Sequence, residues 1–131
     1  GMLLNSVTHP NVIESLSPFM EMIIPGNRLM FILVFTILAP LALYRGPLNI
    51  WGMGSGLAGI LLATHTLSPK AIMAILMSVG CIQGVCDPTN THNVWIANYL
   101  SVDVLTITKK LLPFIWVLVF CALTIAAFKY V

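Results

Sequence analysis

The sequence has very few charged residues. Only 8% of its 131 residues are Asp, Glu, Lys or Arg, whereas an ordinary soluble domain has roughly a quarter. Such a chain cannot cover its own surface with groups that water solvates, which argues against a soluble enzyme. The six basic and four acidic residues are scattered, and the net charge is only +2, so the sequence gives no support to a nucleic-acid partner.

Catalytic and metal-binding patterns are also missing. The chain has no nucleophile elbow, phosphate-binding loop or pair of carboxylates. The three cysteines, Cys81, Cys86 and Cys121, have a spacing that fits no common zinc site, and we expect free thiols. The sequence therefore predicts no enzyme activity, no cofactor and no metal site.

Apolar residues, in contrast, are abundant. They make up 59% of the chain, and the mean hydropathy is +0.99. A spanning helix needs about 20 residues, so the length predicts an all-α membrane protein with about four membrane-embedded helical segments. We expect two regions: an amphipathic interfacial helix within 1–27, and a transmembrane helical region over 28–131 that is one half of a larger inverted-repeat transporter.

The first predicted span runs from Leu29 to Tyr44 and contains no charge. Arg28 and Arg45 stand at its two ends. Its 16 residues rise about 24 Å, which nearly crosses a hydrocarbon core if the flanking arginines reach outward. Pro40 removes one backbone hydrogen bond and should kink the last turn.

The next apolar stretch, 48–64, is rich in glycine. Glycines at 52, 54, 56 and 59 weaken a helix but let another backbone approach closely. This pattern fits either a tightly packed span or half of a re-entrant hairpin, and the sequence leaves both open.

Two further helices are predicted, on either side of a polar interruption. Ser68-Pro69 is typical of a helix start, and the apolar run continues to Cys86. The seven residues 87–93 are polar or proline and should be irregular, with a short apolar segment, 94–100, after them. The last helix should begin near Ser101 or Asp103 and be kinked at Pro113.

The polar interruption is the candidate site. Irregular backbone at membrane depth is tolerated only where protein buries it or where it lines a water-filled cavity, and transporters use such breaks to bind solutes. Thr89, Asn90, Thr91 and Asn93 could bind carboxylate and hydroxyl groups, and Asp87 or His92 could bind or relay a coupling proton or sodium ion. Alternatively, the stretch is a solvent loop, because the 16 residues from Pro69 already rise about 24 Å.

Part of the chain resembles a transporter family. Asn90 followed by Trp95, after an apolar helix that starts at Pro69 and passes Gly80, resembles the late segment of gluconate:proton symporters. The stretch 39–63 resembles the glycine-rich hairpin of these permeases and of the citrate and dicarboxylate carriers in the same ion-transporter superfamily. Such a resemblance implies the C-terminal part of an ion-coupled symporter for small organic anions in the bacterial inner membrane.

The resemblance also implies site residues. It puts Gly46, Pro47 and Asn49 at the hairpin tip, where they would contribute to substrate binding from the side opposite the break. Two positions depart from the family pattern: Pro88 stands in place of a histidine and Thr91 in place of an aspartate. These departures leave the coupling ion and the substrate open.

A transporter of this type places its site between two inverted repeats, and this chain has room for one. We therefore expect it to work with a missing N-terminal half or as a homo-oligomer, and the isolated chain to lack uptake or to dimerise. The competing hypothesis is a non-transporting integral membrane subunit that pairs through its glycine-rich helix. Basic residues flank the spans at both ends, so they do not fix the orientation in the lipid bilayer.

Overall fold

The computed structural model describes residues 5–6, 9–12, 14–15, 18, 27–65 and 67–131. The predicted interfacial helix within 1–27 falls mainly outside these residues. From Asn27 onward the described chain is entirely helical apart from turns, with five α-helices and one 3-10 segment. Three helical stretches, Arg28–Arg45, Pro69–Leu100 and Val104–Tyr130, are long and apolar enough to cross a membrane.

The first candidate span begins as α3 (Arg28–Leu38), where the Asn27 side chain accepts a hydrogen bond from the Leu29 amide. It continues as the 3-10 segment η1 (Ala39–Arg45), which has Pro40 in its first turn. Proline lacks the amide that an α-helix needs, so the change to tighter turns at Ala39 fits the expected disturbance. The chain leaves helical geometry at Leu43 and Tyr44, and Tyr44 takes a left-handed conformation with φ 54°.

The glycine-rich stretch forms a short helix, α4 (Gly54–Ala63), after a series of turns. Its ten residues rise about 15 Å, half of a hydrocarbon core, so a full span is excluded for this segment. The next helix is α5 (Pro69–Cys86). Ser68 caps α5 by accepting from the Ala71 amide, and Pro69 takes the first helical position, as the sequence predicts.

The chain breaks after Cys86 and resumes as α6 (Thr91–Leu100). The break therefore covers only 87–90, and the prediction of irregular structure over 91–93 was wrong. A helix start accommodates polar residues because its first amides have no partner within the helix, so Thr91, His92 and Asn93 form the first turn of α6. Asp103 is the N-cap of the last helix, α7 (Val104–Tyr130), which continues through Pro113.

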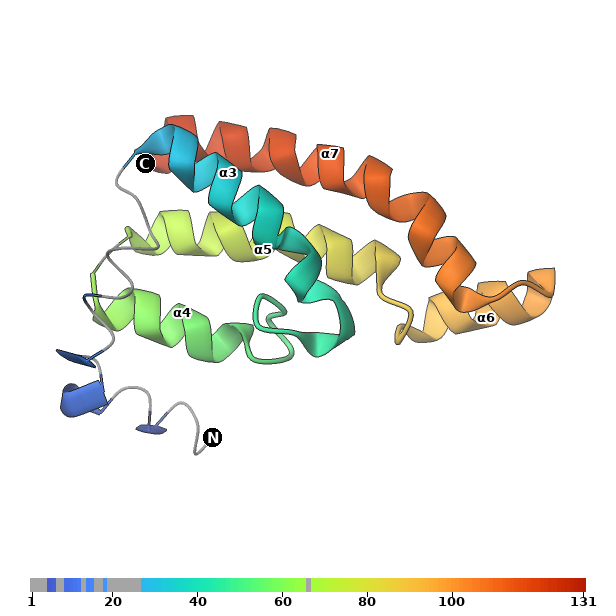
Figure 1. The fold of residues 1–131 in the computed structure, drawn as a ribbon, viewed down its shortest axis with the longest axis horizontal. Helices are drawn as coiled ribbons and strands as arrows, with labels where there is room; N and C mark the ends of the chain where they lie inside the picture. The colour runs from blue at the N-terminus through green and yellow to red at the C-terminus, as the bar shows by residue number, and fades with distance from the viewer. Residues whose placement is uncertain (1–4, 7–8, 13, 16–17, 19–26, 66) are drawn as a thin grey trace.

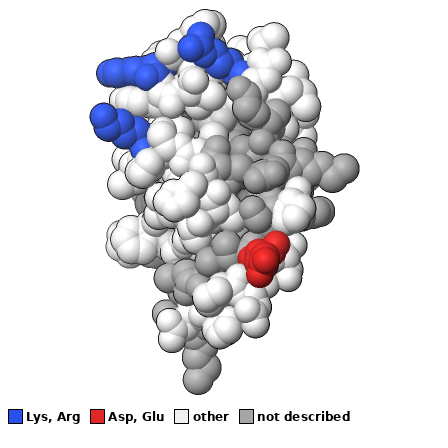
Figure 2. All heavy atoms as spheres, turned by 90° about the vertical axis from the view of Figure 1, so that its left-hand side faces the viewer, with Lys and Arg blue, Asp and Glu red and all other residues white. Residues whose placement is uncertain are grey.

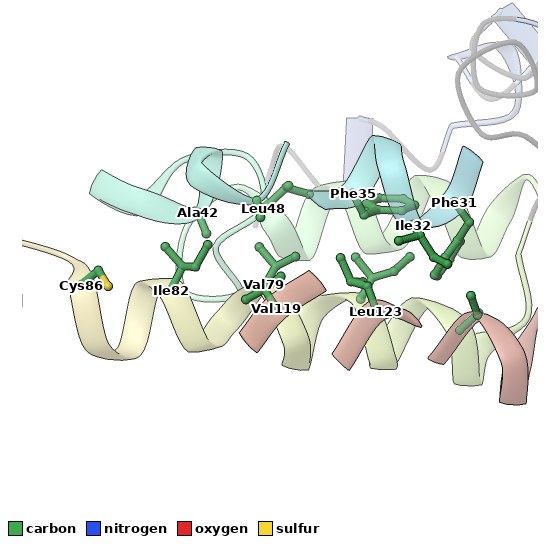
Figure 3. Packing of buried hydrophobic residues seen from close by; sticks show 14 residues of the cluster. Phe31, Ile32, Phe35, Ala42, Leu48, Val79, Ile82, Cys86, Val119 and Leu123 are labelled. Atoms are coloured by element: carbon green, nitrogen blue, oxygen red, sulfur yellow. The ribbon is translucent and has the colours of Figure 1, made fainter. Parts of the chain in front are cut away.

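The α5 helix lies in the middle of the bundle, in contact with α7, η1 and α4 (Figure 1). Residues three and four apart on α5, including Ile75, Val79 and Ile82, form one buried face. That face meets side chains of α3, η1 and α7 (Figure 3). Alanines on η1, α5 and α7 are fully buried and let the backbones approach closely. They are Ala39, Ala42, Ala71 and Ala127.

Candidate functional site

The break between α5 and α6 is organised by one carboxylate. Asp87 Oδ1 accepts hydrogen bonds from the Thr89 amide at 2.8 Å and from the Thr89 hydroxyl at 2.6 Å. The Asn90 amide donates to the Asp87 carbonyl at 3.1 Å and closes the turn. Aspartate bonding to the backbone two residues onward is a common way to stop a helix and begin a turn. The Asp-Pro-Thr-Asn sequence thus sets the break locally.

The same carboxylate joins the break to the first candidate span. Asp87 Oδ2 accepts from the main-chain amide of Tyr44 at 3.0 Å, and the Asp87 side chain is 0% exposed. Tyr44 can offer this amide because η1 unwinds there. Two interrupted helices, 43 residues apart in sequence, therefore meet at a buried acid.

Polar side chains satisfy the carbonyl groups at the end of α5. An α-helix leaves its last four carbonyls without an internal partner. Asn90 Nδ2 donates to the Gln83 carbonyl at 2.7 Å, and Asn93 Nδ2 donates to the Val85 and Asp87 carbonyls, both at 2.9 Å. The Thr108 hydroxyl of α7 donates to the Cys86 carbonyl at 2.7 Å. These hydrogen bonds stabilise the break, and the donor groups that make them are occupied by protein carbonyls.

Asn93 carries two of these bonds from a buried position. Asn93→Ala should lower the free energy of unfolding by about 2 kcal/mol, because two buried carbonyls lose their donor. SDS titration of the protein in dodecyl maltoside micelles, followed by circular dichroism, measures the change. Asn98→Ala, an exposed amide on the same helix, is the matched control and should stay within about 0.5 kcal/mol of wild type. Equal losses in the two variants would contradict this role.

The turn after η1 contains the other predicted residues. Asn49 is buried at 1% exposure, with Nδ2 donating to the Ala42 carbonyl at 3.1 Å and Oδ1 accepting from the Trp51 amide at 2.8 Å. Gly46 is partly buried and Pro47 is exposed. This turn adjoins the break through Tyr44, so the two predicted groups are neighbours in space. Both polar ends of the Asn49 side chain are already bonded, one to η1 and the other within its own turn.

Thr91 and His92 are exposed at the start of α6. Asn90 is the N-cap of this helix but makes no side-chain cap to it, and the first turn contains no acid. The positive end of α6 is therefore free to meet an anion.

Sequence reasoning missed Tyr44 and Thr108. Tyr44 contributes its main-chain amide, which no side-chain pattern reveals. Thr108 is one of two threonines, with Thr106, early in α7, and only packing shows that Thr108 faces the break while Thr106 is exposed.

Three basic residues are close in sequence to residues that bond to the break. Arg45 follows Tyr44, and Lys109 and Lys110 follow Thr108; all three are exposed. The position of these residues along the bundle axis can be compared with the thickness of a membrane. The distance along α7 from Lys109 to Lys129 is about 30 Å, and α5 rises about 26 Å from Pro69 to Cys86. The break and its cations thus lie about one hydrocarbon thickness from the bundle end at which α5 begins.

Apolar surface continues beyond the break. On α6, Trp95 is 70% exposed and Tyr99 is 90% exposed, and Leu105 on α7 is also exposed. On the other side of the break, along α5, a hollow of about 340 Å³ lies between the turn at 50–51 and the α5 face from Leu76 to Gln83. Apolar surface that needs lipid or protein cover is therefore present on both sides of Asp87.

The described residues offer no cluster for a metal ion. Within 27–65 and 67–131 and the shorter described stretches, no group of three His, Cys, Asp or Glu side chains gathers. Cys81, Cys86 and Cys121 are free thiols. Comparison with known proteins adds no assignment, since no protein-family model, curated protein or solved structure matches this chain.

Proposed function

We propose that this chain forms part of an ion-coupled secondary transporter, or permease, for small organic anions such as sugar acids or carboxylates. The observation that carries the proposal is a buried carboxylate, Asp87, at the meeting point of two interrupted helices with apolar surface on both sides of it. Burying a carboxylate away from water is costly unless it is hydrogen-bonded, and carriers bind solutes where helices are broken. The resemblance of 39–63 and of the Asn90 region to gluconate and citrate carriers supports the same function.

The charges around the break favour an anion. Arg45, Lys109 and Lys110 lie next in sequence to residues that bond to the break, and the uncapped start of α6 adds the positive end of a helix dipole. A carboxylate that enters here would meet Thr91 and His92, the two exposed polar side chains of the first turn of α6.

The contacts suggest different roles for the predicted residues. Asn90 and Asn93 act as positioning residues that hold the carbonyls of α5, and Thr89 fixes the Asp87 carboxylate. Asp87 is the residue proposed to respond to the coupling proton or sodium ion, because a change in its charge would alter the bond between the two interrupted helices. The expected location is the bacterial inner membrane, with an N-terminal half or a second copy completing the site.

Cysteine accessibility tests the proposal. In a background with Cys81, Cys86 and Cys121 replaced by serine, Thr91→Cys and His92→Cys should react with a charged methanethiosulfonate reagent from one side of the membrane. Gluconate or citrate should slow that reaction several-fold, because a bound anion would cover the first turn of α6. Ser55→Cys, an exposed position on α4, is the matched control and should show no protection.

A second candidate function also has a specific observation. On α5, Gly80 and Gly84 have open space where a side chain would begin, and this Gly-x3-Gly spacing is typical of helix pairing in membranes. The chain would then be a non-transporting subunit that pairs through α5, not through α4 as its glycine content suggests. Positions 91 and 92 would react freely under all conditions in that case, and such a result would sink the carrier proposal.

A further inference from the structure

A second polar feature lies at the opposite end of the bundle from the break. Three basic residues gather where α3 and α5 begin and α7 ends: Arg28, Lys70 and Lys129. Figure 2, which looks at this end, shows basic side chains together at one edge, apart from the acidic side chain visible on this face. The Arg28 guanidinium lies 6.0 Å from the Phe128 ring centre, and the Ser68 hydroxyl donates to the Tyr130 carbonyl at 3.3 Å. Contacts between the three helices therefore hold the basic groups together.

A hollow of about 530 Å³ opens beside Lys70 and Lys129, between α5 and α7. We call it the α5–α7 groove, and it is lined by Lys70, Met73, Ala74, Met77, Lys129 and Tyr130. Its lining combines two ammonium groups with apolar side chains. Met73 and Met77 are one turn apart on α5 and are 60% and 62% exposed, so the described residues leave most of their surface uncovered.

We propose that the α5–α7 groove binds an anionic phospholipid, with its phosphate between Lys70 and Lys129 and one acyl chain over Met73 and Met77. The depth of the residues matches this occupant. Met73 and Met77 lie about 5 and 10 Å farther along α5 than Lys70, in the direction of the bilayer interior. Lysine and tyrosine at helix ends lie at the headgroup level of a membrane.

Charge and shape together favour a lipid over other occupants. Two ammonium groups and the positive end of the α5 dipole complement a phosphate, and basic pockets between membrane helices bind anionic headgroups. A free phosphate has no apolar part that could contact Met73 and Met77. Methionine is flexible and polarisable, so it adapts to an acyl chain.

Native mass spectrometry of the protein released from dodecyl maltoside tests the proposal. The probes are dioleoylphosphatidylglycerol and dioleoylphosphatidylcholine. We expect at least tenfold tighter binding of the anionic lipid by the wild-type protein. Lys70→Gln/Lys129→Gln should weaken that binding about thirtyfold, because each basic residue near an anionic lipid contributes about 1 kcal/mol. Both positions are exposed, and circular dichroism should show an unchanged fold.

Two further variants separate the explanations. Lys109→Gln/Lys110→Gln removes the same charge at the other end of α7 and should keep the lipid preference. Ala74→Trp should fill the groove and reduce lipid binding while leaving both lysines in place. The proposal is overturned by equal losses in the two double variants, by displacement of the lipid with inorganic phosphate, or by absence of any lipid preference. A lipid-free dimer that Ala74→Trp disrupts would assign the groove to a second copy of the chain and overturn it as well.

Discussion

The Asp87→Asn variant is expected to have a free energy of unfolding about 2 to 3 kcal/mol lower than that of the wild-type protein. Both oxygens of the carboxylate accept hydrogen bonds, one from Thr89 and the other from the Tyr44 amide. An asparagine oxygen can still serve Thr89, but its amino group would then face the Tyr44 N–H, donor against donor. A buried amide without an acceptor costs about 1 to 3 kcal/mol, and bonds to a charged acceptor are at the strong end.

SDS titration in dodecyl maltoside, followed by circular dichroism, measures this loss. Asp87→Ala removes every acceptor and should cost about 4 kcal/mol. The matched control is Asp103→Asn, which also removes one negative charge. Asp103 is an exposed N-cap without a side-chain cap hydrogen bond, and asparagine caps helices about as well as aspartate, so the change should stay below about 0.5 kcal/mol. A similar loss in Asp87→Asn and Asp103→Asn would show that overall charge, and not the bond to Tyr44, is responsible.

Gly46→Ala is expected to destabilise the protein by about 3 kcal/mol. A methyl group at this position would overlap the carbonyl oxygen of Leu41, and at Gly52 it would overlap the carbonyl oxygen of Arg45. Backbone atoms cannot move aside as a side-chain tip can, so the turn that carries Tyr44 would have to shift. Gly52→Ala should therefore have a similar effect. Both losses follow from close backbone packing, and the same SDS titration detects them.

Gly84→Ala is the matched control for both variants. A methyl group there meets nothing within 4 Å, and position 84 lies inside α5. Alanine favours a helix over glycine by about 0.5 to 1 kcal/mol, so this variant should be as stable as wild type or more stable. Wild-type stability of Gly46→Ala, measured beside this control, would be incompatible with the described turn.

Local chemistry explains the parts of the fold that the sequence predicts well. Ser68-Pro69 starts α5 because the Ser68 hydroxyl accepts from the Ala71 amide and proline fits the first helical position. The apolar run between Arg28 and Arg45 forms a candidate span, and Pro40 lies where this span changes from α-helix to 3-10 helix. These features depend on contacts within four residues, which a sequence displays directly.

Predictions of where a helix begins or ends were less accurate. The stretch 48–64 reads as continuous apolar sequence, yet α4 begins only at Gly54 because the residues before it form turns around Asn49. The polar run 87–93 reads as one loop, yet its last three residues are helical. Composition in these places is compatible with two conformations, and packing against other helices selects one.

The sequence by itself determined that this is a helical chain with segments apolar enough to cross a membrane, and that a polar interruption follows Cys86. Only the tertiary structure decided what the interruption does: Asp87 bonds to Tyr44, Asn93 to the end of α5, and Thr108 of α7 to Cys86. The physical reason is that hydrogen-bond partners of buried polar groups come from whichever backbone packs nearest. In this protein those partners include residues 43 and 22 positions away, beyond the range of any local pattern.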